Sequence, residues 1–167
     1  MDGIKMGEAG KVTGVEAYSP CHLEKTHPDL VWYGIHGVET LFTAMGTGCQ
    51  TVVRISTPDT DVAVGTWNDG RIGSFRGLRG KKAGYGGTVF GDKAIVTLGS
   101  YNGYNPLLAE IVKFFSTGEI PVPEEETLEI MAFMEAADVS KKKGGVPVSM
   151  KEIMEKAQKE SKKALKL

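Results

Sequence analysis

The chain has 167 residues, which suits one domain with a single hydrophobic core. Hydrophobic residues make up 41% and charged residues 25%, so the composition is that of a globular protein and excludes disorder as the main state. The formal net charge of −1 excludes a global field that attracts nucleic acid or an anionic membrane.

Patterns of alternating apolar residues and turn residues predict strands in the first two thirds of the chain. Asn68-Asp69-Gly70 is a hairpin signal, because these residues tolerate positive φ between two alternating runs. A second such turn is expected at residues 91–93. We therefore predict a meander of antiparallel strands in the middle of the chain, preceded by one further strand. The predicted strands are residues 11–18, 49–57, 61–67, 71–76, 87–90 and 94–98.

Apolar residues at helical spacing predict helices on both sides of this block. The first covers residues 35–45 and ends at Gly46, and the second begins at Pro106 and ends at Gly118. A third begins near Glu124, where an acidic first turn suits the helix dipole. The last is capped by Ser149, with Glu152 completing a capping box.

This order of elements predicts an α+β fold: a large, mostly antiparallel mixed sheet with helices packed on one face and the other face available for a subunit or domain interface. We expect a lead-in at residues 1–8, the main domain at 9–148, and a Lys-rich helix at 149–167. Acidic residues interrupt that helix, which favours a solvated helix over a nucleic-acid tail.

Residues 21–39 contain all three histidines of the chain. His36 falls in the first turn of a predicted helix, where the exposed N–H groups disfavour a positive charge. A neutral imidazole can accept the proton of a sugar or polyol hydroxyl. The alternative is a buried histidine that caps the helix start. Trp32 and Tyr33 are either core aromatics or a platform for a sugar ring.

A metal site is a competing interpretation of the same stretch, since it holds Cys, His, Asp and Glu side chains. The spacing argues against it, because His22 and His27 are five residues apart and no HExxH or CxxC occurs. The simpler prediction is a polar surface loop and no bound metal.

The stretch 71–82 holds five basic residues and no acidic one. Arginines such as Arg76 either bind a carboxylate or phosphate, or form the polar face of a sheet that meets acidic groups of a partner.

Several segments together resemble the C-terminal domain of the Gfo/Idh/MocA oxidoreductases, the family of glucose-fructose oxidoreductase and inositol dehydrogenase. The similar segments cover roughly residues 9–150. They include WYGIHGVETLF at 32–42, MGTGC at 45–49, NDGRIG at 68–73, EIVKFF at 110–115, and EETLEI at 125–130 with FMEAAD at 133–138.

The resemblance implies a C-terminal α/β domain that lacks the N-terminal Rossmann domain of the family, because no GxGxxG follows a strand here. It also implies that His36 assists proton transfer. Trp32 stands where the family has an acid four residues before this histidine, so Asp29 or Glu39 is the alternative acid. The upstream catalytic lysine of the family is missing, and any role of Lys25 is unrelated to it.

From this resemblance we expect the substrate-binding and oligomerisation domain of an NAD- or NADP-dependent oxidoreductase, inactive in isolation and forming a homo-oligomer through the open sheet face. The substrate is a sugar or cyclitol-like alcohol. Two alternatives are a non-catalytic ligand-binding or scaffold module and a metal-dependent sugar lyase or hydrolase. We expect a cytoplasmic protein without a nucleic-acid or membrane partner. Predicted site residues are His36 as catalytic and Trp32, Tyr33, His22, Lys25 and Arg76 as substrate-binding, with none for cofactor or metal.

Overall fold

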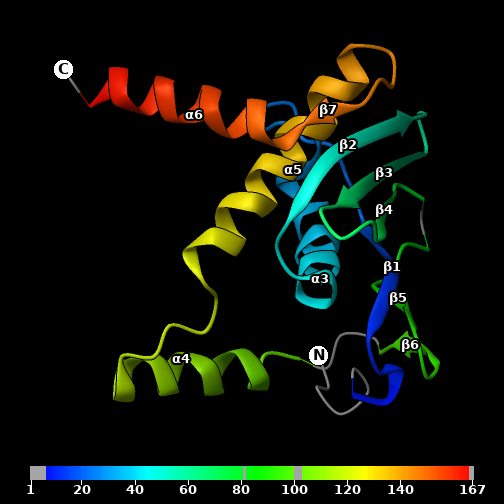
Figure 1. The fold of residues 1–167 in the computed structure, drawn as a ribbon, viewed down its shortest axis with the longest axis vertical. Coiled ribbons are helices and arrows are strands. Elements are labelled where there is room, and N and C mark those ends of the chain that lie inside the picture. The colour runs from blue at the N-terminus through cyan, green and yellow to red at the C-terminus, as the bar shows by residue number, and fades with distance from the viewer. Residues whose placement is uncertain (1–6, 81, 100–102, 166–167) are drawn as a thin grey trace.

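The computed structural model describes residues 7–80, 82–99 and 103–165. Its centre is a seven-stranded sheet with the order β6-β5-β1-β4-β3-β2-β7 (Figure 1). The strands are β1 (Val12–Pro20), β2 (Cys49–Ser56), β3 (Thr60–Trp67), β4 (Ile72–Leu78), β5 (Gly86–Gly91), β6 (Ile95–Leu98) and β7 (Val148–Ser149).

The sheet is mixed: β1 and β4 run parallel, and the other neighbouring pairs are antiparallel. The predicted α+β fold with a mostly antiparallel sheet is confirmed. The predicted continuous meander is wrong, because β4 and β5 do not pair and β1 lies between them. Turn signals predict only which strands form local hairpins, and they do not show where β1 is inserted. Strand β1 lies between β4 and β5 because its side chains Val15 and Ala17 are buried in the same core as Phe75 of β4 and Val89 of β5.

The helices are α2 (Asp29–Trp32), α3 (Ile35–Met45), α4 (Asn105–Thr117), α5 (Glu124–Lys142) and α6 (Met150–Ala164). Their ends follow the sequence signals. Gly46 and Gly118 adopt positive φ at the C-termini of α3 and α4. Ser149 Oγ accepts a hydrogen bond from Glu152 N at 3.4 Å at the start of α6. The short helix α2 was not predicted.

The core lies between one face of the sheet and the helices α3 and α5. The ring of Phe42 in α3 lies 5.5 Å from Trp67 of β3 and 5.6 Å from Phe133 of α5. Trp67 Nε1 donates to Gly46 O at 2.9 Å, so the indole is satisfied although buried. On the other face of the sheet, the described residues leave a hollow over β1, β3, β4 and β5 uncovered.

Two helices depart from the expected packing. Every residue of α4 is exposed, so the expectation that it packs on the sheet is wrong for this helix. The apolar stripe shows which side of α4 could be buried, and it does not show against which element. Helix α6 buries only Met150 and Ile153, next to β7, and then extends outward (Figure 1). Residues 1–6 of the expected lead-in and 166–167 of the last helix lie outside the described residues. The domain boundaries remain predictions.

In the described part of the chain, no helix combines the length and apolar character that crossing a bilayer requires.

Candidate functional site

The segment between β1 and α3 carries the three histidines, and buried residues anchor it. Cys21 N donates to Leu78 O at 2.8 Å, which holds the segment beside the end of β4. Leu30 of α2 is fully buried. At Gly34 a Cβ would lie 3.0 Å from both Cys21 Sγ and the Leu30 carbonyl oxygen, so the chain is tightly packed there. The residues between these anchors reach solvent.

The rings of His22, Tyr33, His36 and Tyr85 form a continuous cluster. The ring of Tyr33 lies 5.8 Å from His22 and 5.5 Å from His36, both edge-on. The His36 ring lies 6.3 Å from Tyr85, which precedes β5. The sequence places Tyr85 only in a turn, because no local pattern connects it to residues so much earlier in the chain. The predicted residues His22, Tyr33 and His36 are therefore brought together, and Tyr85 joins them.

His36 is paired with Glu39. The imidazole Nδ1 lies 3.2 Å from Glu39 Oε2, one helical turn further along α3, and both side chains are about half exposed, at 51% and 52%. The alternative of a buried helix-start histidine is excluded by this exposure. A carboxylate at Nδ1 favours the imidazole form that carries its hydrogen there and keeps Nε2 as the basic nitrogen.

The other candidate acid, Asp29, is held elsewhere. Its Oδ2 accepts from Arg54 Nη2 at 3.0 Å and from Lys141 Nζ at 2.6 Å. Of the two carboxylates that the sequence leaves open, Glu39 is therefore the one that lies at His36.

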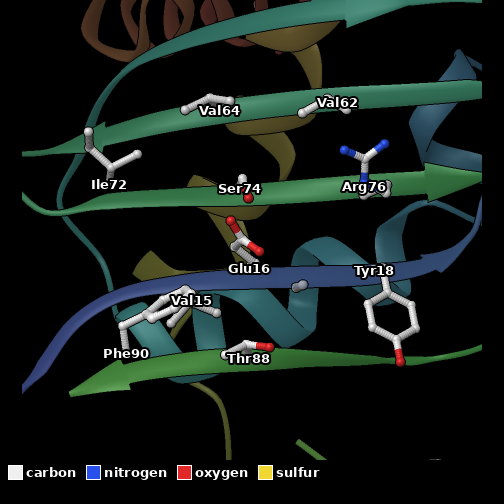
Figure 2. A pocket seen from close by; sticks show the side chains of 11 residues that line it. Val15, Glu16, Tyr18, Val62, Val64, Ile72, Ser74, Arg76, Thr88 and Phe90 are labelled. Carbon is white, nitrogen blue, oxygen red and sulfur yellow. The ribbon is translucent and has the colours of Figure 1, made fainter. Parts of the chain in front are cut away.

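The remaining predicted substrate residues are more scattered. Trp32 is 45% exposed and packs its ring 4.9 Å from His27, so it belongs to the surface and not to the core. Lys25 is exposed in the same loop. Arg76 lies on the open face of the sheet, away from the helical face that carries α3 (Figure 2). The structure does not bring Arg76 into the His36 cluster.

A local carboxylate fixes the exposed loop. Glu24 accepts from the backbone N of Thr26 at 2.7 Å and from the Thr26 hydroxyl, and His27 Nδ1 lies 3.1 Å from the same oxygen. These hydrogen bonds, those from Thr26 foremost, lower the pKa of Glu24 to about 2. Since Glu24 holds His27, and His27 packs on Trp32, the loop presents these rings in a defined arrangement.

Behind the histidine segment lies a buried ionic network centred on Arg54 of β2. Arg54 Nε donates to Asp61 Oδ1 at 2.9 Å, and Nη1 donates to Asp138 of α5. Asp61 also accepts from Arg79. Together with Asp29 at the start of α2, the network connects two strands, α5 and the segment that leads to His36.

Burial and charge act in opposite directions on the ionisable groups near this network. Burial raises the pKa of Asp29, but the hydrogen bond from Lys141 and the charges of Lys141 and Arg54 outweigh it, so the pKa is lowered. Burial raises the pKa of the Cys21 thiol, and burial followed by the charge of Glu129 raises that of Cys49 to about 12. Both thiols therefore stay protonated at neutral pH and are not nucleophiles.

Among residues 7–80, 82–99 and 103–165, no three His, Cys, Asp or Glu side chains converge in a way that could hold a metal ion.

No family model and no curated protein matches the chain. Solved structures do match its fold. The chain is similar to scyllo-inositol dehydrogenase from Lactobacillus casei with bound NAD(H) and scyllo-inositol, at 13% identity and a TM-score of 0.69, covering 88% of this chain and 59% of that one. It is also similar to myo-inositol 2-dehydrogenase from Lactobacillus plantarum, at 14% identity and a TM-score of 0.70, covering 87% and 59%. A third is GenD2 from gentamicin A biosynthesis in complex with NAD, at 16% identity and a TM-score of 0.66, covering 86% and 56%.

The fold is therefore that of the Gfo/Idh/MocA-type inositol dehydrogenases over part of their length, which confirms the resemblance at the level of the fold. This chain spans less than two thirds of each of these three structures. At identities this low, the structural similarity establishes the shared fold alone, and the activity has to be argued from the site.

Proposed function

We infer that the chain is the substrate-binding and oligomerisation domain of an NAD- or NADP-dependent oxidoreductase that acts on a sugar or a cyclitol-like alcohol. The observation that carries this proposal is the pairing of His36 with Glu39 on a fold shared with dehydrogenases of sugars and cyclitols. The rings of Tyr33 and Tyr85 flank His36 and offer flat apolar surfaces with hydroxyl groups at their tips.

Oxidation of a secondary alcohol to a ketone removes a proton from the hydroxyl oxygen and a hydride from the carbon that carries this hydroxyl. His36 accepts the proton at Nε2, and Glu39 stabilises the imidazolium that forms because its carboxylate lies at Nδ1. His22 belongs to the ring cluster, and we assign Trp32 and Lys25, which are exposed in the segment between β1 and α3, to the proposed substrate surface as well.

The described residues do not fit a dinucleotide. Such cofactors bind where a glycine-rich turn lets the backbone at a helix start approach the pyrophosphate. At the start of α3, the space beside Gly37 is filled by protein: a Cβ there would lie 2.3 Å from the Phe75 ring and 2.8 Å from Ser19 Oγ. NAD(H) is bound in the scyllo-inositol dehydrogenase and NAD in GenD2, and here the hydride acceptor has to come from another domain.

The open sheet face supports the proposed oligomer. Apolar side chains on this face surround Glu16 of β1 and Arg76 of β4 in a hollow of about 580 Å³ (Figure 2). The occupant we propose is a second copy of the chain, because an opposite pair of charges on one face becomes self-complementary across a two-fold axis. The apolar residues that line the hollow include Val62, Val64, Ile72 and Phe90.

The substrate proposal is tested by NMR titration of the purified chain with scyllo-inositol and myo-inositol, with glycerol as the control ligand. We expect saturable shifts of the His36, Tyr33 and Tyr85 ring signals with Kd in the millimolar range, about −4 kcal/mol, because half of the site is missing. His36→Gln weakens binding, and Arg71→Gln, on the surface, does not. The absence of shifts with either inositol contradicts the proposal. Titration with NADH is expected to give no saturable fluorescence change.

A second candidate function is a non-catalytic ligand-binding module with the same fold. The observation that favours it is the exposed indole of Trp32, which stands where the family has an acid. Such a module binds the ring alcohol equally well with His36 replaced by Gln, whereas the dehydrogenase domain does not.

A further inference from the structure

The segment between β1 and α3 exposes an indole that the ring cluster around His36 does not use. Trp32 is 45% exposed, although a tryptophan side chain has more apolar area to bury than almost any other. Leu23 in the same segment is also exposed. Trp67, the other tryptophan of the chain, is only 2% exposed. The segment that leads to His36 therefore presents two large apolar side chains to solvent.

Two ring pairs connect the loop after β1 with the end of α2. The ring of His22 lies 5.8 Å from Tyr33, and the ring of His27 lies 4.9 Å from Trp32. Tyr33 continues to His36 at 5.5 Å, so the first pair belongs to the cluster around the proposed base. Among the described residues, His27 is the one ring that the indole of Trp32 contacts. The second pair thus stands outside the cluster.

The geometry at the end of α2 explains why the two pairs are separate. Trp32 is the last residue of α2 and Tyr33 follows it, and successive residues at a helix end point about 100° apart around the axis. Since Tyr33 points toward His36, the indole points away from it. His36 N donates to Tyr33 O at 3.4 Å, so the chain turns there, and the Cα atoms of Trp32 and His36 lie closer than the extended limit of about 14 Å. A group linked to a ring at His36 is within reach of the indole.

Hydrogen bonds fix the residue on which the indole packs. Glu24 accepts from Thr26 N at 2.7 Å, and the same carboxylate lies 3.1 Å from His27 Nδ1. Leu30, in the middle of α2, is fully buried and anchors this helix to the core. An aromatic ring that is already held in one place loses little conformational entropy when a ligand covers it.

The chemistry around the indole suits a neutral sugar ring. The face of such a ring presents C–H groups, which pack on a flat aromatic surface, and its rim carries hydroxyl groups. Exposed Lys25 and Thr26 in the same loop supply hydrogen-bond donors for these hydroxyl groups. Residues 22–27 contain one Glu and one Lys, so the loop has no net charge, which favours a neutral ligand over a phosphate-bearing one.

We propose that Trp32, packed on His27, is a second ring-binding site, and that the substrate is a glycoside whose alcohol ring at His36 is linked to a further sugar ring. This inference rests on the proposed function and narrows its substrate class from sugars and cyclitols in general to glycosides. The linked ring covers the indole while His36 accepts the hydroxyl proton of the first ring. Contact at two places raises the affinity without changing the chemistry at His36.

The test compares one-ring and two-ring ligands on the purified chain. Myo-inositol is paired with galactosyl-myo-inositol, and glucose with maltose. O-methyl-myo-inositol carries a substituent without a second ring and is the control ligand. In NMR spectra, the indole N–H signal of Trp32 reports the second site and the ring signals of His36 report the first. We expect a two-ring ligand to move both and to bind about tenfold tighter than its single ring.

Substitution of the indole tests whether this gain comes from Trp32. Trp32→Ala is expected to lower the gain from about tenfold to about twofold or less, and Trp32→Phe, which keeps a smaller ring, to retain part of it. Phe115→Ala is the matched control, because it removes an exposed ring from α4, and it should leave the gain unchanged. Equal melting temperatures of the three variants verify that each of them folds.

Three results overturn the inference: two-ring ligands that bind no tighter than their single rings, a gain that persists in Trp32→Ala, and an equal gain with O-methyl-myo-inositol, which would place the contact beside the first ring.

The same titrations separate this inference from the proposed function. If the single rings bind at His36 and a second ring adds nothing, the proposed function stands and the glycoside class is wrong. If the two-ring ligands move the Trp32 signal but not those of His36, the indole binds a sugar ring and the role of His36 in the proposed function is wrong.

Discussion

Arg54 and Asp61 face each other on the neighbouring strands β2 and β3, with Nη2 2.8 Å from Oδ1 and neither side chain exposed to solvent. Asp138 of α5 and Asp29 of α2 contact the same guanidinium. Since a buried charge is costly unless it is paired, the arrangement is stable only when complete. One cation thus ties two strands and α5 to the segment that leads to His36.

Replacing Arg54 by Met removes this cation and leaves Asp138 without its partner. We expect the free energy of unfolding to fall by about 3–5 kcal/mol, because an uncompensated carboxylate remains buried. Arg71→Met is the matched control: it breaks the exposed pair with Asp69 and costs about 0.5 kcal/mol. Urea denaturation of both variants checks this. Similar losses in the two would show that the buried network contributes no more than a surface pair.

The lowered pKa of Asp29 predicts a pH-dependent contribution to stability. A carboxyl whose pKa is lower in the folded state stabilises the protein above its unfolded value, near 3.9, and this contribution disappears as the pH falls through the folded pKa. Asp29→Asn should therefore be less stable than the parent at pH 7, by on the order of 1 kcal/mol since the group is partly exposed and screened.

The difference between the parent and Asp29→Asn should shrink as the pH falls below about 4, because the carboxyl of the unfolded parent takes up a proton there and the folded carboxyl, whose pKa is lower, follows at still lower pH. Thermal unfolding from pH 7 down to pH 3 measures it. Asp59→Asn, at an exposed residue with no ion pair in the described part of the chain, is the control and should show no such trend. A difference that stays constant with pH contradicts the assignment.

Local patterns predict the elements of this fold better than their arrangement. Gly46, Gly118 and Ser149 mark helix ends correctly, because each acts on the backbone within one turn. The insertion of β1 between β4 and β5 could not be predicted, since the alternation within a strand says which face is buried and not which strand lies beside it.

The candidate site shows the same limit. The turn of helix that separates Glu39 from His36 makes their contact predictable, and the sequence does offer Glu39 as one of two acids. The contact of Tyr85 with His36 and those of Asp29 with Arg54 and Lys141 join segments far apart in the chain. The apolar stripe of α4 likewise predicts a helix that packs on a core, and it carries no signal that α4 stands apart from the sheet.

Gly37 is required by packing. A Cβ at this position would lie 2.3 and 2.6 Å from atoms of the Phe75 ring, and Phe75 is fully buried, so the ring cannot move away freely. We expect Gly37→Ala to destabilise the protein by about 1–3 kcal/mol and to displace the start of α3, which carries His36. Gly80→Ala, where nothing lies within 4 Å, is the matched control. Equal melting temperatures for the two variants would contradict this packing argument.

The proposed sheet interface is testable by reversing its charges. In a two-fold dimer, Glu16 of one copy meets Arg76 of the other, so Glu16→Arg and Arg76→Glu each place like charges together and weaken association. The double variant restores the opposite pair and should restore the dimer. Sedimentation velocity at micromolar concentration measures all four proteins. A parent that is strictly monomeric, or a double variant no better than the single ones, counts against the interface.

The pairing of His36 with Glu39 predicts which ring nitrogen carries the proton. With the carboxylate at Nδ1, the neutral imidazole keeps its hydrogen on Nδ1 and leaves Nε2 free. Glu39→Gln removes the charge that favours this form, so we expect a shift toward the form with hydrogen on Nε2. Two-bond ¹⁵N–¹H NMR spectra at about pH 8.5, where an ordinary imidazole is neutral, report the change directly.

His27 is the internal control in the same spectra, because its Nδ1 pairs with Glu24 and is untouched by the substitution. Its signals should stay in place while those of His36 move. In the complete enzyme, Glu39→Gln should lower kcat less than His36→Gln does, since the first change only disturbs the base and the second removes it. Unchanged His36 signals in Glu39→Gln would show that the carboxylate does not set the imidazole form, and the proton-accepting role of Nε2 would lose its structural basis.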